Sequence, residues 1–404
     1  MNEDIFITSI HIDKVRNIDN FTIPLSETER KHLIITGKNG SGKTSLLLEI
    51  NKFLEASVQY SGEQLKSWKN TLESIKDFMK TNKFDQAKKS DKDLFERQID
   101  LFGNTIISFN NKERLRYVIN DGDYLLTFFE SKRVVSTKNP TGINKVELKK
   151  IYNTKERINQ DFIQYIVNLK AERSFAKDDN DNEAAKKIDA WFERFENQLK
   201  ELFDEPNLQL VFDRKNYNFN IQIGDNEPFT LTQLSDGYSA VLTIVTELIL
   251  RMEATGNKAY DVQGVVLIDE IETHLHVALQ KKIMPFLCAF FPNIQFIVTT
   301  HSPFVISSIS NAVVCDLETR EVINDLSGYS YEALVESYFN VDEYSEILKE
   351  KLQQFKTLAE KLELTEQEQD NYIDLERYFK ELPKFGADEL AFELDQIKLK
   401  RMTR

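Results

Sequence analysis

The sequence predicts an α/β fold, with a mixed or parallel sheet flanked by helices, helical insertions and a helical C-terminal region. Three apolar runs carry this prediction, at residues 33–35, 265–268 and 294–298. Each run is followed by glycine or polar residues, as at the carboxyl end of a buried strand. Between and after these runs, apolar residues recur at three- and four-residue spacing, which is typical of amphipathic helices.

Length and charge bound the class of protein. At 404 residues the chain suits two or three domains, or one large domain with insertions. A net charge of -14 gives no general attraction to nucleic acid or to an anionic membrane. The start of the chain lacks a secretory pattern, and the most apolar helix, 240–250, is too short to cross a bilayer. We therefore expect a cytoplasmic protein without a membrane partner. Cys288 and Cys315 lack metal-ligand spacing and suit buried free thiols.

The N-terminal third alternates between strand and helix patterns. Short antiparallel strands are expected over residues 5–25, with Arg16 and Asn17 in a polar turn. A helical insertion follows, and strands are predicted again at 105–109, 116–119 and 124–128. Asn120, Asp121 and Gly122 supply hairpin-turn chemistry between the last two.

The middle of the chain predicts two long helices over residues 147–203, broken near 178–182. They form either a protruding hairpin or a packed lobe. Further helices are predicted at 331–339, 344–362 and 364–382. The expected domains are a core (1–50 and 205–320), a helical insertion (51–103), strands completing the core (104–146), a helical hairpin or lobe (147–204) and a helical C-terminal region (321–404).

The strand at 33–36 runs into a glycine-rich loop and then a helix. The loop matches G-x-x-x-x-G-K-[ST], a pattern in which backbone N–H groups close around a phosphate. Lys43 is expected to reach the β- and γ-phosphates, and Thr44 to bind Mg²⁺. The predicted binding residues are Gly37, Lys38, Asn39, Gly40, Ser41, Gly42, Lys43, Thr44 and Ser45.

Two carboxylates follow the buried run at 265–268. Asp269 suits the Mg²⁺ shell, and Glu270 suits a base that orients the attacking water. His301 follows the next buried run. Because both runs belong to a parallel sheet, their carboxyl ends should share one edge, where His301 would contact the γ-phosphate or the water. His274 and His276 are not expected to bind zinc, since residues two apart do not share a helix face.

The sequence LSDGY, at residues 234–238, lies before the run at 265–268 and opens a strongly apolar helix. Ser235 is a good N-cap, and Gly237 allows another backbone to approach the helix end closely. On its own this pattern predicts only a capped helix.

The ordered set GKNGSGKT, LSDGY, VVLIDE and TTHSP resembles the phosphate loop, signature, Mg²⁺/catalytic-acid strand and switch histidine of ABC-type ATPases. It looks most like the SMC-like and RecF-like branch, in which the turn matching Arg16 and Asn17 approaches the nucleotide. The phrases IDEIETHLH and IVTTHSPFVISS are similar to ATPases of antiphage systems, such as the Septu, PARIS, retron-associated and OLD-type groups. Asp236 and Tyr238 depart from the common signature, and residues 128–133 hold no glutamine where a glutamine loop is expected.

The resemblance implies an ABC-type head that forms homodimers or higher homo-oligomers. ATP would lie between one subunit's phosphate loop and the Ser235 and Gly237 signature of the other. It also implies a separate effector, such as an HNH or TOPRIM nuclease, with nucleic acid reached through the complex. Two alternatives are a repair ATPase that clamps DNA directly, which the acidity disfavours, and a scaffold with structural ATP.

Overall fold

The computed structural model describes residues 4–81, 86–133, 138–255, 260–330, 334, 346–361, 363–381, 394 and 396–397. The chain divides into two compact units. Met1–Tyr329 is called the head below, and Ser330–Arg404 the C-terminal unit.

The head is built on a six-stranded sheet with the order β12-β11-β3-β10-β9-β5. Five strands run parallel, and the edge strand β12 is antiparallel to β11. The strands are β3 (His32–Thr36), β5 (Tyr124–Phe129), β9 (Gln263–Ile268), β10 (Ile294–Thr299), β11 (Ala312–Asp316) and β12 (Glu321–Asn324). Every residue of β3, β5, β10 and β11 is buried, which accounts for the continuous apolar runs. The predicted α/β class with a mixed sheet is confirmed.

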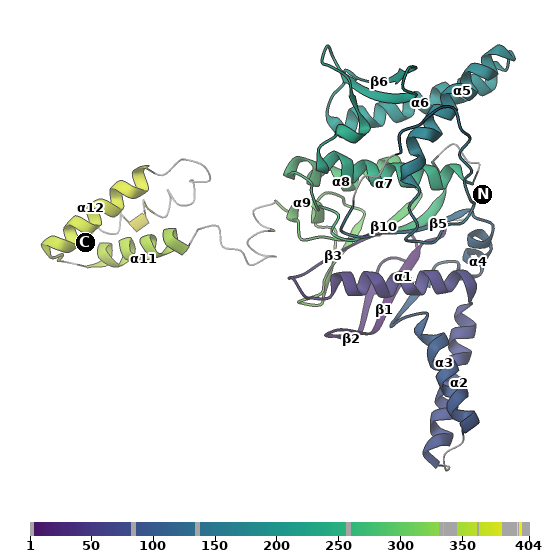
Figure 1. Ribbon diagram of the computed structural model, residues 1–404. Coiled ribbons are helices and arrows are strands. Elements are labelled where there is room, and N and C mark those ends of the chain that lie inside the picture. Colours follow the sequence, from purple (N-terminus) through teal and green to yellow (C-terminus); the bar gives the residue numbers. More distant parts are fainter. Residues whose placement is uncertain are drawn as a thin grey trace. The chain divides into compact units, whose positions relative to one another are not determined.

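Helices cover both faces of this sheet (Figure 1). Helix α1 (Lys43–Gln59) lies on one face, while α7 (Asp236–Glu253) and α8 (Val277–Phe290) lie on the other. Leu46, Leu47 and Ile50 of α1 are fully buried in one cluster with sheet residues. Every residue of α7 from 240 to 253 is buried, as expected for a helix held between a sheet and further structure.

A small antiparallel sheet, β2-β1-β4, packs beside α1. Its strands are β1 (Ile7–Val15), β2 (Ile18–Pro24) and β4 (Thr105–Phe109). Val15 pairs with Ile18, so Arg16 and Asn17 form the tight turn between β1 and β2. The predicted strands before the glycine-rich loop are confirmed.

The helical insertion forms a hairpin that extends away from the sheet (Figure 1). It consists of α2 (Gly62–Thr81) and α3 (Gln86–Asp100). One prediction nearby is wrong, because residues 116–119 belong to α4 (Lys112–Asn120) and not to a strand. The Asn111 side chain caps α4 by accepting from Arg114 N, and Leu115 and Ile119 bury one face four residues apart. The apolar residues of this short segment fit the period of a strand as well as that of a helix, and the Asn111 cap favours the helix.

The lobe consists of α5 (Phe162–Asp178), α6 (Asn182–Phe203) and a sheet of β6 (Leu208–Asp213), β7 (Asn218–Ile223) and β8 (Phe229–Thr230). The break between the two helices lies where it was predicted, and Asp181 caps α6. The helix predicted from residue 147 is wrong, because 147–158 contain no helix and a 3₁₀ turn at Asn159–Asp161 precedes α5. Ile158 N and the carbonyl of residue 153 there bond to the buried side chains of Glu247 and Arg251 in α7.

The C-terminal unit contains α11 (Glu346–Glu360) and α12 (Glu366–Glu381), close to the helices predicted at 344–362 and 364–382. Phe355 is fully buried between them and stacks on Tyr372. Residues 321–324, expected in a helical region, form strand β12 of the head. The helix predicted at 331–339 lies, apart from Leu334, outside the described residues.

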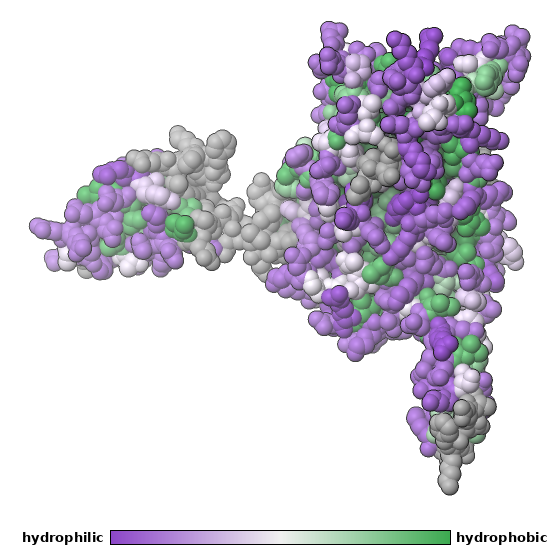
Figure 2. All heavy atoms as spheres, viewed as in Figure 1, coloured by the Kyte–Doolittle hydropathy of each residue, from purple (hydrophilic) through white to green (hydrophobic). Residues whose placement is uncertain are grey.

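Hydrophilic residues cover most of the visible face of the head and of the C-terminal unit (Figure 2). Among the described residues, no helix has both the length and the apolar character that crossing a membrane requires.

Candidate functional site

The glycine-rich loop between β3 and α1 has a backbone that only glycine adopts readily. Gly37, Gly40 and Gly42 have φ angles of 131°, 85° and 106°. A Cβ on Gly37 would lie 3.0 Å from Ser41 Oγ and 3.3 Å from Asp316 Oδ1. The loop therefore curls tightly at the start of α1, where the backbone N–H groups and the helix dipole favour an anion.

Lys43 closes over this loop. Its Nζ donates to Gly37 O at 2.8 Å and to Lys38 O at 3.1 Å, and its side chain is buried. Burial lowers the pKa of Lys43, and the carboxylates of Glu270 and Glu272 oppose that shift. The buried Ser41 Oγ has no hydrogen-bond partner within the described chain. An orphaned hydroxyl, an ammonium and a glycine cradle together fit a phosphate group.

Lys38 and Asn39 lie on the outer part of the loop, and Ser45 lies in the first turn of α1. Lys38 is exposed and pairs with Glu318 at 2.7 Å, and Asn39 is exposed. Ser45 Oγ accepts from Arg16 Nε at 2.7 Å. The β1–β2 turn is thereby tied to the phosphate loop.

The two residues of that turn play different parts. Arg16 has a positive φ of 53°, and its guanidinium reaches Ser45 in the first turn of α1. Asn17 contributes its backbone carbonyl, which accepts from Arg320 at 2.9 Å. No hydrogen bond from the Asn17 side chain to the loop is present in the described residues.

The predicted metal-binding pair is brought together by the sheet. Thr44 Oγ1 lies 3.2 Å from Asp269 Oδ1, and Asp269 is buried at the end of β9. Thr299, at the end of β10, donates to the same oxygen at 2.6 Å and accepts from Glu270 N at 2.7 Å. A hydroxyl and a carboxylate are the oxygen ligands that Mg²⁺ prefers, so Thr44 and Asp269 fit a magnesium ion.

Glu270 and His301 lie on the same edge. Glu270 has a strained φ of 45°, and its Oε2 accepts from Thr273 Oγ1 at 3.3 Å. His301 N donates to Glu272 Oε1 at 2.6 Å. Burial and then the charge of Lys43 lower the pKa of His301, and opposing carboxylates include Glu270. The charges that act on His301 therefore come from Lys43 and from the carboxylates at the same edge of the sheet, and the lowered pKa favours the neutral imidazole.

The signature residues lie at the start of α7. Ser235 occupies the N-cap position as predicted, but its exposed side chain makes no capping hydrogen bond. Gly237 is buried, and a Cβ there would lie 2.9 Å from His274 O, in the turn after Glu270. The close backbone approach predicted for Gly237 thus occurs within the chain itself. No hydrogen bond joins Ser235 or Gly237 to the phosphate loop within the described residues.

Three residues of the site were not predicted from the sequence. Arg133, following β5, donates to the carbonyls of Asp269 at 2.9 Å, Glu270 at 2.9 Å and Ile271 at 3.3 Å. Burial lowers its pKa from 12.5 to about 10. Thr299 bridges the two acids, and Glu272 holds the His301 backbone. Arg133 lies within residues 128–133, the segment in which a glutamine loop is expected. Its place in that segment is the sequence signal that could have identified it as a site residue.

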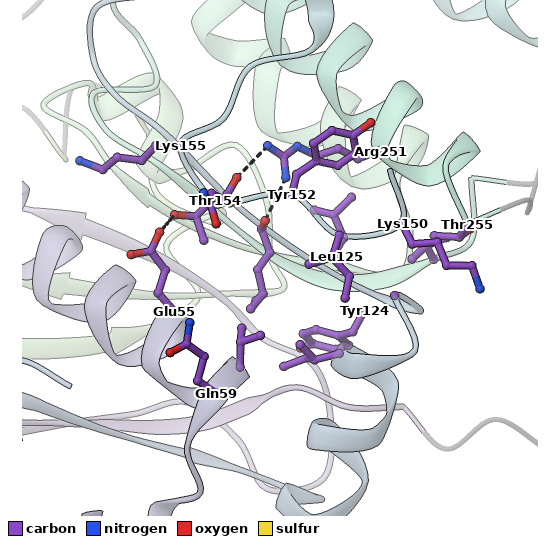
Figure 3. Close-up of a pocket in the computed structure, with 17 residues that line it drawn as sticks. Glu55, Gln59, Tyr124, Leu125, Lys150, Tyr152, Thr154, Lys155, Arg251 and Thr255 are labelled. Carbon is purple, nitrogen blue, oxygen red and sulfur yellow. Dashed lines mark hydrogen bonds between the residues drawn. The ribbon is translucent and has the colours of Figure 1, made fainter. Parts of the chain in front are cut away.

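A cavity of about 470 Å³ lies at the other end of α1 and not at the phosphate loop. It is bordered by the end of α1, strand β5, residues 150–155 and the end of α7. Thr154 bonds Glu55 there, and Arg251 reaches the backbone of residue 153 (Figure 3). None of the predicted site residues lines this cavity.

Comparison with known proteins gives sequence relatives and structural neighbours. A Septu protein PtuA of Bacillus mycoides (strain KBAB4) is 26% identical over 348 residues, covering 83% of this chain and 44% of that protein. A retron Ec83 probable ATPase of Escherichia coli is 33% identical over 138 residues, covering 31% of this chain and 26% of that protein. An SMC head domain from Thermotoga maritima has a TM-score of 0.36 at 12% identity, covering 77% of this chain and 94% of that structure.

The chain spans less than half the length of these curated relatives. The predicted resemblance to ATPases of bacterial defence systems is confirmed by their names. A family model described as "AAA domain, putative AbiEii toxin, Type IV TA system" matches residues 33–307, which is more than half of the chain. The chain therefore belongs to this family of AAA domains.

Proposed function

We propose that this protein binds and hydrolyses ATP with Mg²⁺. The observation that carries the proposal is the hydrogen-bonded chain from Thr44 through Asp269 and Thr299 to the Glu270 backbone. It joins the first turn of α1, beside Lys43, to the carboxyl ends of the neighbouring parallel strands β9 and β10. That is the arrangement needed to hold a metal ion, a phosphate and a water-activating carboxylate at one edge of a sheet.

Each residue has a defined task in this proposal. The loop amides and Lys43 bind the phosphates, and Thr44 and Asp269 hold the magnesium. When bound, Mg²⁺ neutralises phosphate charge and orients the phosphate oxygens. Glu270 accepts a proton from the attacking water, and the neutral His301 is placed to donate or accept a hydrogen bond at the γ-phosphate.

We further propose that two copies close head to tail around ATP. The start of α7 supports this, because the Ser235 hydroxyl is exposed and does not cap its own helix. The N-terminus of a long helix favours an anion, and Ser235 would donate to the γ-phosphate on the partner's loop. Loss of that phosphate would weaken the pair and make ATP a switch.

The names of the relatives support a proposal for the role of this protein in the cell. Their names, a Septu protein and a retron probable ATPase, support a part in antiphage defence. We infer that the ATP-bound pair controls a separate effector protein, a nuclease of the HNH or TOPRIM type, and that nucleic acid is reached through that complex. Co-purification of the full chain with the product of the neighbouring gene, followed by mass spectrometry, tests this step.

The decisive experiment compares Glu270→Gln with Lys43→Ala. Glu270→Gln keeps the shape of the site and removes the base, so it should bind ATP, lose at least about 100-fold in turnover and accumulate as a dimer in Mg-ATP. Lys43→Ala should neither bind nor dimerise. Phosphate release and multi-angle light scattering measure both properties. Normal turnover by Glu270→Gln would refute the catalytic assignment, and a monomeric Glu270→Gln protein in saturating Mg-ATP would refute the dimer.

A further inference from the structure

A second cavity of about 370 Å³ lies between the end of β5, the chain at 155–160 and the middle of α7. Its lining is polar throughout. The charged residues in it are Glu130, Lys132, Arg133, Lys155 and Arg157. No residue of the phosphate loop lines it, and Arg133 is the residue that it shares with the site described above.

The lining carries an excess of positive charge in an acidic chain. Four cations face one carboxylate, Glu130, whose Oε1 pairs with Lys155 at 2.9 Å. Both partners of that pair are about half exposed, so it contributes little. The other acids nearby are engaged elsewhere, since Asp161 pairs with Lys138 and Glu247 with Arg251.

Arg133 is the buried member of this group. Its side chain is 9% exposed, and its two terminal nitrogens bond to the carbonyls after β9. Its Nε is buried and has no acceptor among the described residues. The acids Glu272, Asp269 and Glu270 lie on its catalytic side and raise its pKa against burial. A buried guanidinium N–H without an acceptor is rare and points to a missing partner.

Arg157 is in a similar position. Its terminal nitrogens donate to the carbonyls of Phe128, Thr154 and Glu156, and the guanidinium lies 4.8 Å from the centre of the Phe129 ring. No carboxylate lies within ion-pair distance of Arg157 in the described part of the chain. Both arginines are thus held rigidly by backbone oxygens, and their charge is not cancelled by a direct partner.

Rigid guanidinium groups with mobile lysines beside them match the chemistry of phosphate, which accepts several charge-assisted hydrogen bonds. The volume is at the lower end of ligand sites, enough for a phosphate with part of a nucleoside. Among the described residues, no aromatic ring lines the cavity to stack on a base. We propose that this cavity is a second anion site that binds a phosphate group, either as a small free anion or at the 5′ end of a nucleic-acid strand.

Arg133 connects this cavity to Asp269 and Glu270. The Arg133 side chain that lines the cavity also holds the carbonyls of Asp269 and Glu270. A phosphate bound there competes with those carbonyls for the guanidinium, so occupancy changes ATP turnover. This consequence rests on the proposed ATPase function, whereas binding itself does not.

Binding is tested in the Lys43→Ala background, so that the phosphate loop does not take up the probe. The probes are inorganic phosphate and a six-nucleotide single strand that carries either a 5′-phosphate or a 5′-hydroxyl. Their binding is measured by titration calorimetry. Lys132→Gln/Lys155→Gln removes two exposed cations of the cavity and should weaken binding of the 5′-phosphate strand by about tenfold. Lys186→Gln/Lys187→Gln removes the same charge from the exposed face of α6 and should leave binding within about twofold.

The outcomes separate the two sources of phosphate. Competition by inorganic phosphate at the variant-sensitive site identifies a small anion, and preference for the 5′-phosphate strand without such competition identifies a strand end. Equal binding of the 5′-phosphate and 5′-hydroxyl strands, equal weakening by both lysine pairs, or no binding would overturn the proposal. In the chain with Lys43 intact, adding the probe that binds should change the rate of ATP turnover, which tests the coupling between the cavity and the nucleotide site. Absence of all turnover would count against the ATPase proposal alone.

Discussion

The ring of Tyr238, in the first turn of α7, lies flat on the ring of Phe203 at the end of α6, with centroids 4.2 Å apart and planes at 5°. Lys282 of α8 pairs with Asp204 next to it at 3.2 Å. The end of α6 is thereby fixed to the start of α7 and to α8. Tyr238, which departs from the common signature, therefore has a packing role in this chain.

Replacing Tyr238 should separate stacking from hydroxyl chemistry. Tyr238→Ala loses the ring contact and should lower the free energy of unfolding by about 1–3 kcal/mol. It should also reduce the ATP-dependent dimer fraction, because α7 is less firmly positioned. Tyr238→Phe keeps the stack and serves as the control. Denaturant unfolding and light scattering measure both, and equal behaviour of the two variants would show that the stack has no such role.

Substitution of Gly237 tests the packing of α7 on the turn that follows Glu270. In Gly237→Ala the new Cβ would lie 2.9 Å from His274 O, so the helix end or the turn must move. We expect a loss of about 1–3 kcal/mol in stability and slower ATP turnover. Gly142→Ala is the matched control, since nothing lies within 4 Å of its Cβ. A Gly237→Ala protein as active and stable as this control would contradict the steric argument.

His32 should make stability depend on pH. Burial lowers its pKa from 6.5 to about 4, and Nδ1 accepts from Phe296 N. The unfolded chain then binds more protons between these values, so stability is full above pH 6.5 and falls as the pH drops toward 4. The loss from this group is at most about 3 kcal/mol.

His32→Gln offers an acceptor that does not titrate. The difference in unfolding free energy between the parent and this variant, measured by urea at several pH values, should shrink toward acid pH across the window from 6.5 to 4. Carboxylates titrate in both proteins and cancel in the comparison. A difference that stays constant from pH 7 to pH 4 would mean that His32 is not buried in its neutral form.

Glu247 is fully buried in α7 and supports the irregular chain before the lobe. Its carboxylate accepts from Ile158 N and Asn159 N at 2.8 Å each and from Arg251 Nε at 2.8 Å. Glu247→Ala leaves Arg251 buried without its partner and should cost about 3–5 kcal/mol of stability. Glu183→Ala, which breaks an exposed pair with Lys187, should change it by less than about 1 kcal/mol. Thermal and urea unfolding measure both variants, and similar small losses would show that Glu247 is not structurally important.

The sequence by itself predicted the glycine-rich loop and the parallel strands of the sheet. The strand, the glycine-rich loop and the helix over residues 33–50 could be predicted because this loop requires positive φ angles at Gly37, Gly40 and Gly42, which only glycine adopts readily. The buried runs before Asp269 and His301 predicted parallel strands, which bring their carboxyl ends to one edge. These are local patterns, and each is specified by its own residues.

Tertiary structure decided what local patterns leave open. Residues 116–119 became helix because Asn111 caps α4, and residues 147–158 stayed irregular because Glu247 and Arg251, about 90 to 100 positions away, satisfy their backbone groups. Arg133 lies beside Asp269 and Glu270 because β5 pairs with β9. Such contacts depend on which distant segments are buried together, because a buried N–H, carbonyl or charge takes whatever partner the packing provides.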